Sequence, residues 1–311
     1  MDFKLELAVL PVSDVDRAKE FYVSPARSIA AGVSTAAWAT WARLSTSSRG
    51  MPGGATASVS APVGTMTTTA RMSRGSSTIN AGSQHPARRE VRMTQASLDD
   101  LDLVLTTMAK TIVDNADYFA HLDSIVGDGD FGYSLRNGWE VVVSDYDTFD
   151  HSSAGSILKK VALTLTAKVG GVSGPIWGTA FLRAGGTAGD RTELAPEDVI
   201  AMLRAAITGI MARGSASLGE KTLLDALVPA TDSLEAAIGD PALQGDHGVA
   251  AIQRAADVAV KAAEETKGML AMRGRAAYTG ERSIGSVDAG ATAIGVILQA
   301  ISAAWREKHG S

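Results

Sequence analysis

Apolar side chains recur every three or four positions in the part of the chain that follows residue 92. This is the spacing of one face of an α-helix, and no stretch after residue 92 shows the two-residue alternation that is typical of a strand. Ser97 is a suitable N-cap and Pro196 a suitable first-turn residue for two of these helices. The sequence therefore predicts an all-α domain over residues 93–311, with helical patterns at 98–119, 157–165, 196–210, 222–237, 247–267 and 287–306.

The first 92 residues have a different character. Residues 3–12 read as a strand and residues 13–23 as a helix, and together they resemble the opening of the glyoxalase/bleomycin-resistance superfamily. This short fragment carries no metal ligand of that superfamily, so it predicts no function. Residues 24–92 are rich in Ser, Ala, Gly, Thr and Arg, and they contain too few large apolar side chains to offset the entropy cost of ordering.

We expect residues 24–92 to form a disordered linker. A second interpretation is that this stretch belongs to an artefactual extension and that the natural chain begins at Met93, just before the first predicted helix. N-terminal sequencing of the natural protein distinguishes the two, because a mature chain that retains Met1 would reject the second.

Composition narrows the classes of function. The chain of 311 residues contains no cysteine, which excludes disulfides, thiolate zinc sites and cysteine nucleophiles. Its formal net charge of −5 weighs against nucleic acid as a partner, because a protein that binds the phosphate backbone usually has a basic face. The apolar runs are short and broken by glycine, and the N-terminus lacks the layout of a signal peptide. We therefore expect a cytoplasmic protein that has neither a nucleic acid nor a membrane as its partner.

Three carboxylates lie close together in residues 121–132, whose sequence is HLDSIVGDGDFG. The intervening glycines let the backbone turn tightly, so Asp123, Asp128 and Asp130 can converge. Three like charges at one place are costly unless a cation lies between them, and oxygen ligands without nearby Cys favour Mg²⁺. The alternative is a solvated acidic turn, and this loop alone does not decide between the two.

Three familiar motifs are rejected on spacing and context. GDGDFG fits G-x-G-x-x-G, but it follows a predicted helix rather than a strand, and its carboxylates would repel a pyrophosphate without a metal. An EF-hand would need a different ligand spacing and a closing Glu. GSASLGEKT at 214–222 comes within one residue of a P-loop, but Glu220 breaks the spacing; Lys221 then lies one helical turn from Asp225.

Two further glycine-rich joints could bind anionic oxygens. In residues 170–179, GGVSGPIWGT, the backbone N–H groups, the Ser173 hydroxyl and a helix start after Pro175 suit phosphate; close helix packing through small residues is the alternative. In residues 274–292, Arg275 could pair with a phosphate through its planar guanidinium. Asp288 either contributes to that site or caps the last helix.

Taken in order, these segments resemble one family. The motifs DxxxxGDGDxG, GGxSGPxxGT, GEKTxLDALxPA and GRAxYxGERSIGxxDxGAT resemble the nucleotide-binding L subunit of dihydroxyacetone kinase, and the resemblance extends over residues 97–306. It implies an antiparallel eight-helix barrel with an ADP or ATP molecule at one end.

The resemblance also implies a role for individual residues. Asp123, Asp128 and Asp130 match the acids that hold two Mg²⁺ ions against the nucleotide phosphates. Arg275 matches a residue that stabilises phosphate charge, and no other catalytic side chain is expected. Phe131 and Ser134 stand where many members have His and Asn, so phosphate contact at Phe131 would be through the backbone or lost. The implied nucleotide contacts are Phe131, Gly132, Ser134, Val172, Ser173, Gly219, Thr222, Arg275, Asp288, Ala289 and Gly290.

The function that the resemblance implies is phosphoryl transfer from Mg-nucleotide to dihydroxyacetone or a related small ketose. A K subunit would hold the ketose, a phosphocarrier M subunit could recharge the nucleotide from phosphoenolpyruvate, and the chain would form a homodimer or a hetero-oligomer. Two alternatives stay open: a nucleotide domain like that of fatty-acid kinases, and a non-catalytic regulatory subunit that senses nucleotide.

Overall fold

The structure of the chain, a computed structural model, describes residues 95–238, 240 and 248–310. The predicted strand and helix in residues 1–23, the predicted linker at 24–92 and the proposed start at Met93 lie outside the described residues.

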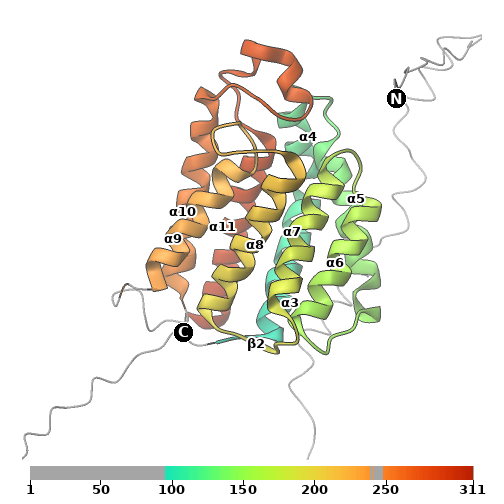
Figure 1. Cartoon of the computed structure of the whole chain (residues 1–311), viewed down its shortest axis with the longest axis vertical. Helices are drawn as coiled ribbons and strands as arrows, with labels where there is room; N and C mark the ends of the chain where they lie inside the picture. Colours follow the sequence, from blue (N-terminus) through green and yellow to red (C-terminus); the bar gives the residue numbers. More distant parts are fainter. Residues whose placement is uncertain (1–94, 239, 241–247, 311) are drawn as a thin grey trace, which may run out of the picture.

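Long antiparallel helices form a closed ring (Figure 1). Each helix packs against the next one along the chain, and the last packs against the first. The short helix α4 (Ala116–Ser124) joins the first two members of the ring. The described residues therefore confirm the predicted all-α, antiparallel eight-helix barrel, whose members are α3 (Leu98–Asp114), α5 (Phe131–Asp145), α6 (Ala154–Lys168), α7 (Ser173–Ala188), α8 (Pro196–Gly214), α9 (Leu224–Ile238), α10 (Val249–Glu265) and α11 (Ala289–His309).

Local signals in the sequence set several helix ends. Ser97 caps α3 in a capping box with Asp100, as its position before an apolar run predicts. The apolar pattern that continues to residue 119 is divided at Asn115, whose side-chain amide donates to the carbonyl of Thr111 at 2.8 Å and ends α3. Pro196 occupies the first position of α8, where its missing N–H costs nothing.

Two very short strands were not predicted. β1 (Ala96–Ser97) and β2 (Glu193–Leu194) pair antiparallel, with Ala96 opposite Leu194. A strand of two residues is too short to show alternation, so the sequence pattern could not reveal it. The pair ties the start of α3 to the segment before α8, at the end of the barrel where α11 finishes (Figure 1).

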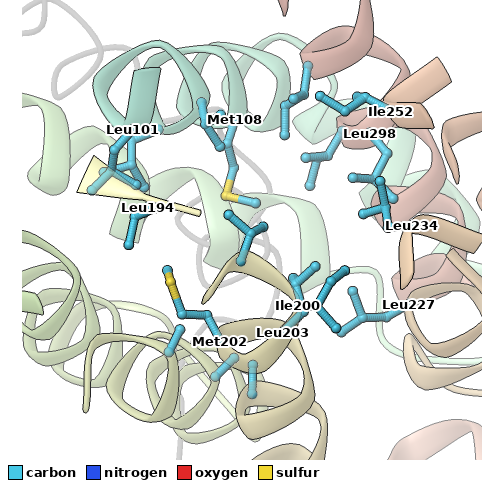
Figure 2. A pocket seen from close by; sticks show the side chains of 18 of the residues that line it. Leu101, Met108, Leu194, Ile200, Met202, Leu203, Leu227, Leu234, Ile252 and Leu298 are labelled. Atoms are coloured by element: carbon cyan, nitrogen blue, oxygen red, sulfur yellow. The ribbon is translucent and has the colours of Figure 1, made fainter. Parts of the chain in front are cut away.

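Apolar side chains from most of the helices point toward the centre of the barrel. They enclose a cavity of about 350 Å³ whose wall is almost entirely aliphatic and aromatic (Figure 2). Residues labelled on the cavity wall include Leu101, Met108, Met202, Leu227, Leu234, Ile252 and Leu298.

Among the described residues, no helix combines the length and the apolar character that crossing a bilayer requires.

The joints with the candidate chemistry gather at one end of the barrel. Because successive long helices run in opposite directions, the joints at 125–130, 169–172, 215–223 and 266–288 lie at the same end as α4, and β2 lies at the other (Figure 1). Two short 3-10 helices, η3 (Thr266–Gly268) and η4 (Arg275–Ser283), belong to the last of these joints, and η1 (Tyr146–Thr148) follows α5.

Candidate functional site

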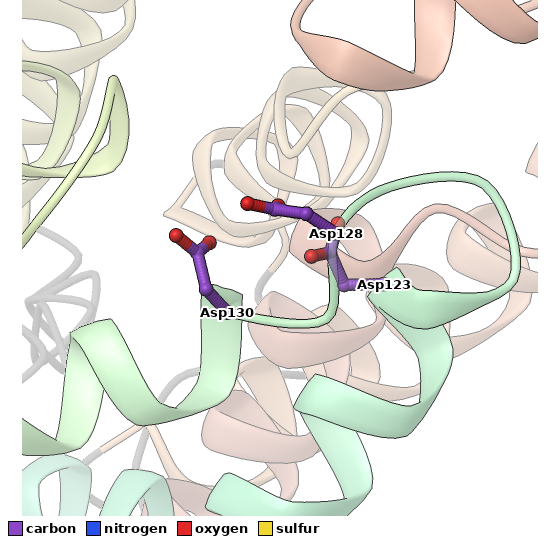
Figure 3. A group of neighbouring side chains, drawn as sticks. All are labelled: Asp123, Asp128 and Asp130. Atoms are coloured by element: carbon purple, nitrogen blue, oxygen red, sulfur yellow. The ribbon is translucent and has the colours of Figure 1, made fainter. Parts of the chain in front are cut away.

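The three predicted metal ligands lie together at the junction of α4 and α5. Asp123 is in the last turn of α4, Asp128 is in the connecting loop, and Asp130 immediately precedes α5. One carboxylate oxygen from each lies within 4.8 Å of the others (Figure 3). Asp128 and Asp130 are exposed and Asp123 is half-buried, so the group opens to solvent. Three oxygen donors in this arrangement suit a hard divalent cation, which would offset their mutual repulsion.

The backbone of this loop fixes the position of Asp123. The N–H of Gly129 donates to Asp123 Oδ2 at 2.8 Å, and Gly129 has φ +74°, a conformation that favours glycine. A Cβ atom at Gly127 would lie 2.3 Å from Asp123 Oδ1. Both glycines are therefore needed for the carboxylate to lie where it does, as the sequence predicted from their spacing.

Arg275 reaches this group from the far end of the chain. Its guanidinium forms an ion pair with the carboxylate of Asp128, which brings η4 over the α4–α5 loop. The side chain of Arg275 is 61% exposed, so it remains largely open to solvent. The sequence singled out both residues but could not show that they pair.

The start of α5 lies next to the glycine-rich joint before α7. A Cβ atom at Gly170 would lie 3.0 Å from the Ser134 hydroxyl oxygen, so these two predicted phosphate-binding segments are in contact. Gly132 is buried, and a Cβ there would lie 1.9 Å from the carbonyl oxygen of Ala116. The ring of Phe131 packs near that of Phe119, with 6.4 Å between centroids, so Phe131 serves the packing of α4 on α5.

Helix α7 begins earlier than predicted. Its first residue is Ser173, so Pro175 lies inside the first turn rather than before it. Proline is accepted there because the first turn has no intrahelical acceptor for its missing N–H. Val172 precedes the helix and is 70% exposed. The N–H groups at this helix start remain the part of the joint that suits an anion.

The turn at 215–223 differs from its predicted form. Lys221 is not one helical turn before Asp225, because it has φ +61° and α9 begins only at Leu224. The Asp225 carboxylate instead accepts hydrogen bonds from the backbone N–H groups of Gly219, at 2.5 Å, and Thr222, at 2.7 Å. Gly219 has φ +82°. The buried carboxylate of Asp225 therefore shapes the turn that was predicted to approach a nucleotide.

Asp288 caps α11, which was one of its two predicted roles. Its Oδ2 accepts from the N–H of Ala291 at 2.7 Å, and its own N–H donates to the Thr266 hydroxyl at 2.8 Å. Burial, with the nearby Asp225 carboxylate, raises the pKa of Asp288 to about 7. The role of Asp288 as a cap does not exclude a nucleotide contact, which remains a prediction.

Three contacts link the predicted segments in pairs at this end of the barrel. Asp128 joins Arg275, and Gly170 joins Ser134. Ala289 and Gly290 begin α11, and a Cβ at Gly290 would lie 3.2 Å from the Leu223 Cβ, which joins them to the turn at 215–223. Sequence reasoning missed the part played by Lys221 and Asp225, although both belong to a motif that it had quoted.

Comparison with known proteins identifies the family of this chain. A family model described as DAK2 domain matches residues 125–303. The chain is 36% identical over 203 residues to the PEP-dependent dihydroxyacetone kinase, ADP-binding subunit DhaL, of Escherichia coli (strain K12), a match that covers 65% of this chain and 95% of that protein. It is 31% identical over 197 residues to the D-erythrulose kinase of Mycolicibacterium smegmatis, which covers 63% of this chain and 33% of that enzyme.

A solved structure shares the fold. The dihydroxyacetone kinase of C. freundii in complex with AMP-PNP and Mg2+ matches with a TM-score of 0.52 and 24% identity, over 74% of this chain and 38% of that one. At this identity the match supports the helical barrel alone. The family model spans more than half of the chain, and the E. coli subunit is matched over nearly its whole length. This chain therefore belongs to the DAK2 domain family and is a homologue of the L subunits of dihydroxyacetone kinases.

Proposed function

We propose that this chain is the ADP/ATP-binding subunit of a dihydroxyacetone kinase, which passes a phosphoryl group to a small ketose held by a partner. The observation that carries the proposal is the convergence of Asp123, Asp128 and Asp130 within 4.8 Å, with Arg275 on Asp128. Three carboxylates beside a guanidinium suit a ligand that brings both divalent cations and anionic oxygens.

Each part of the site has a distinct task in this proposal. The three carboxylates would hold two Mg²⁺ ions, which when bound neutralise phosphate charge in a loose transition state. Arg275 would pair with a phosphate and supply fixed positive charge. The N–H groups at the start of α7, from Ser173 onward, and the turn at Gly219 would orient the nucleotide. No covalent intermediate on the protein is needed.

The names of the relatives support the choice of nucleotide and acceptor. The E. coli relative, matched over 95% of its length, is named as an ADP-binding subunit of a phosphoenolpyruvate-dependent dihydroxyacetone kinase. We therefore propose a K subunit that holds the ketose, and a phosphocarrier as the phosphoryl source in place of free ATP. The erythrulose kinase is matched over 33% of its length, so a four-carbon ketose is a second candidate acceptor.

The test is phosphoryl transfer to dihydroxyacetone and to erythrulose, measured with and without an added K subunit of a related system. We expect binding of Mg-ADP by this chain alone, and turnover only when the K subunit and a phosphoryl donor, supplied as phosphoenolpyruvate with the phosphocarrier proteins of that related system, are both present. Asp130→Asn should remove Mg-ADP binding in calorimetry while the helical circular dichroism is kept, because it deletes one cation ligand. Asp147→Asn, at an exposed acid in η1 far from the loop, is the matched control.

Three outcomes would decide against the proposal or its site. Turnover of a fatty acid instead of a ketose would favour the fatty-acid-kinase-like alternative. Binding of ADP with no turnover in any pairing would favour the regulatory alternative. Undiminished ADP affinity in Asp130→Asn would show that the cation site is assigned to the wrong residues.

A further inference from the structure

The ammonium group of Lys221 is buried between three backbone carbonyls. The residue is 3% exposed, and its Nζ donates to the carbonyl oxygens of Ser286 at 2.7 Å, of Met269 at 3.3 Å and of Ser283. A lysine ammonium has three hydrogens, so these three acceptors use all of them. Nothing remains to bind a phosphate, although the sequence GEKT comes close to that of a P-loop.

Burying the ammonium group of Lys221 costs free energy, which its hydrogen bonds must offset. Burial lowers the pKa of Lys221, while the nearby Asp288 carboxylate favours the charged form. The backbone of Lys221 is also left-handed, with φ +61°, which is strained for a residue with a side chain. Such features persist only where the surrounding contacts determine them strongly.

All three carbonyls belong to one segment, residues 269–286, which we name the Arg275 loop. Its two ends approach each other at Lys221, because Met269 lies near its start and Ser283 and Ser286 near its finish. The Ser283 hydroxyl strengthens this closure by accepting from the N–H of Ala271 at 3.0 Å. Lys221 therefore holds the two ends of the loop together.

The preceding residue, Glu220, binds the same loop at two further positions. Its carboxylate accepts two hydrogen bonds from Arg273, at 2.6 and 2.8 Å, and its carbonyl accepts from the N–H of Met272 at 3.1 Å. Two adjacent residues of the 215–223 turn thus bind five positions on the Arg275 loop. Arg275 itself follows directly and reaches Asp128.

We infer that Lys221 is a positioning residue. It holds the two ends of the Arg275 loop together and so keeps Arg275 next to Asp128. It acts through backbone carbonyls and does not contact the nucleotide. The expected effect on Mg-nucleotide binding rests on the proposed function. The hydrogen bonds that hold the loop are already present in the ligand-free protein.

The first test is hydrogen exchange on the ligand-free protein. Lys221→Met keeps the unbranched apolar stem of the side chain, one atom shorter, and removes the donors, so the amides of residues 269–286 should exchange about tenfold faster or more. The amides of α5 and α6 should be unchanged. Lys110→Met, which removes an exposed lysine paired with Asp114, should leave the Arg275 loop as it is. Equal exchange of the loop in Lys221→Met and the wild type would overturn the inference.

A second variant covers the case in which Lys221→Met fails to fold. Arg273→Gln removes the ion pair with Glu220 at a partly exposed position and leaves the buried lysine in place. The same amides should exchange faster, by a smaller factor than in Lys221→Met. No change in Arg273→Gln, together with an unfolded Lys221→Met, would assign Lys221 to the stability of the whole barrel and overturn the inference.

The third test is a double-mutant cycle on Mg-ADP affinity. Lys221→Met should weaken binding in the wild-type background and have almost no further effect in Arg275→Ala, because its influence passes through Arg275. An equal loss of affinity in both backgrounds would show that Lys221 affects binding independently of Arg275 and would overturn the inference. If the wild type fails to bind Mg-ADP, the proposed function is lost, and hydrogen exchange still decides whether Lys221 fastens the loop.

Discussion

The guanidinium of Arg275 is paired with the carboxylate of Asp128, one of three acids that converge at the α4–α5 junction. Both side chains are partly exposed, so the pair adds little to the stability of the fold. Its expected importance is local, because a cation bound by the proposed site would compete with Arg275 for Asp128. The same guanidinium would then be free to pair with a phosphate.

Substituting Arg275 should therefore have opposite effects on two ligands. Arg275→Gln removes a positive charge beside the acids, so the affinity for Mn²⁺ alone, followed by electron paramagnetic resonance, should rise severalfold. The affinity for Mg-ADP should fall, because the phosphate loses its charged partner. Arg282→Gln, at an exposed position of the same loop, is the control. A fall in both affinities would contradict the exchange of partners.

Local patterns predicted the all-α fold and the carboxylate group, and the family resemblance predicted the barrel. The three- and four-residue spacing of apolar positions, with Ser97 and Pro196 at helix starts, suffices for an all-α fold because each signal acts within one helix. The carboxylates were predictable because Gly127 and Gly129 bring residues of one short loop together. The family resemblance carried by the four ordered motifs implied that the helices close into a barrel. Periodicity alone does not predict this closure.

Contacts between distant segments could not be read in this way. Lys221 binds carbonyls of residues 269, 283 and 286, and backbone carbonyls have no signature in the sequence. The predicted helical neighbour of Lys221, Asp225, instead accepts from the N–H groups of Gly219 and Thr222. Extending the helical pattern to residue 222 was wrong for that reason, since the carboxylate of Asp225 stabilises a turn that precedes α9.

Gly127 should be required for cation binding rather than for folding. In Gly127→Ala the new methyl group would lie 2.3 Å from Asp123 Oδ1, so the carboxylate must move. We expect the Mg-ADP affinity to fall by about tenfold or more, because ligand geometry is strict for Mg²⁺, with a small change in melting temperature. Gly186→Ala, on the open surface of α7, has no atom within 4 Å and should raise stability by up to ~1 kcal/mol. Unchanged affinity in Gly127→Ala would remove Asp123 from the ligand set.

Asp100 links the two ends of the described domain, and the stability that this link contributes should be lost in acid. Burial alone would raise the pKa of Asp100, but hydrogen bonds from Lys308, the Ser97 N–H and His309 outweigh it and lower the pKa to about 2. An ordinary Asp has a pKa near 3.8. The stabilisation is therefore complete above pH 4 and is lost as the pH falls from about 4 to about 2.

Urea unfolding measures this contribution. Asp100→Asn should reduce the free energy of unfolding at pH 7 by about 2 kcal/mol, the value that corresponds to the pKa difference, and the deficit should disappear near pH 2. Asp99→Asn changes an exposed acid in the same helical turn and should cost far less. A deficit in Asp100→Asn that does not depend on pH would mean that shape, rather than charge, holds the ends together.

Asp288 should make the protein less stable as the pH rises. Its pKa of about 7, raised by burial and by Asp225, lies above that of the unfolded chain, so the folded state holds a proton that the unfolded state releases above pH 4. Stability should then decrease from about pH 4 to about pH 7 and level off beyond. Asp288→Asn keeps the oxygen that accepts from Ala291 and cannot ionise, so its melting temperature should exceed that of the wild type at pH 8 and approach it at pH 5. Asp288→Ala loses the cap and should be less stable than Asp288→Asn by about 1 kcal/mol at both pH values. If Asp288→Asn were less stable than the wild type at pH 8, the ionised carboxylate would be favoured in the fold, and the neighbouring ammonium of Lys221 would be the group that favours it.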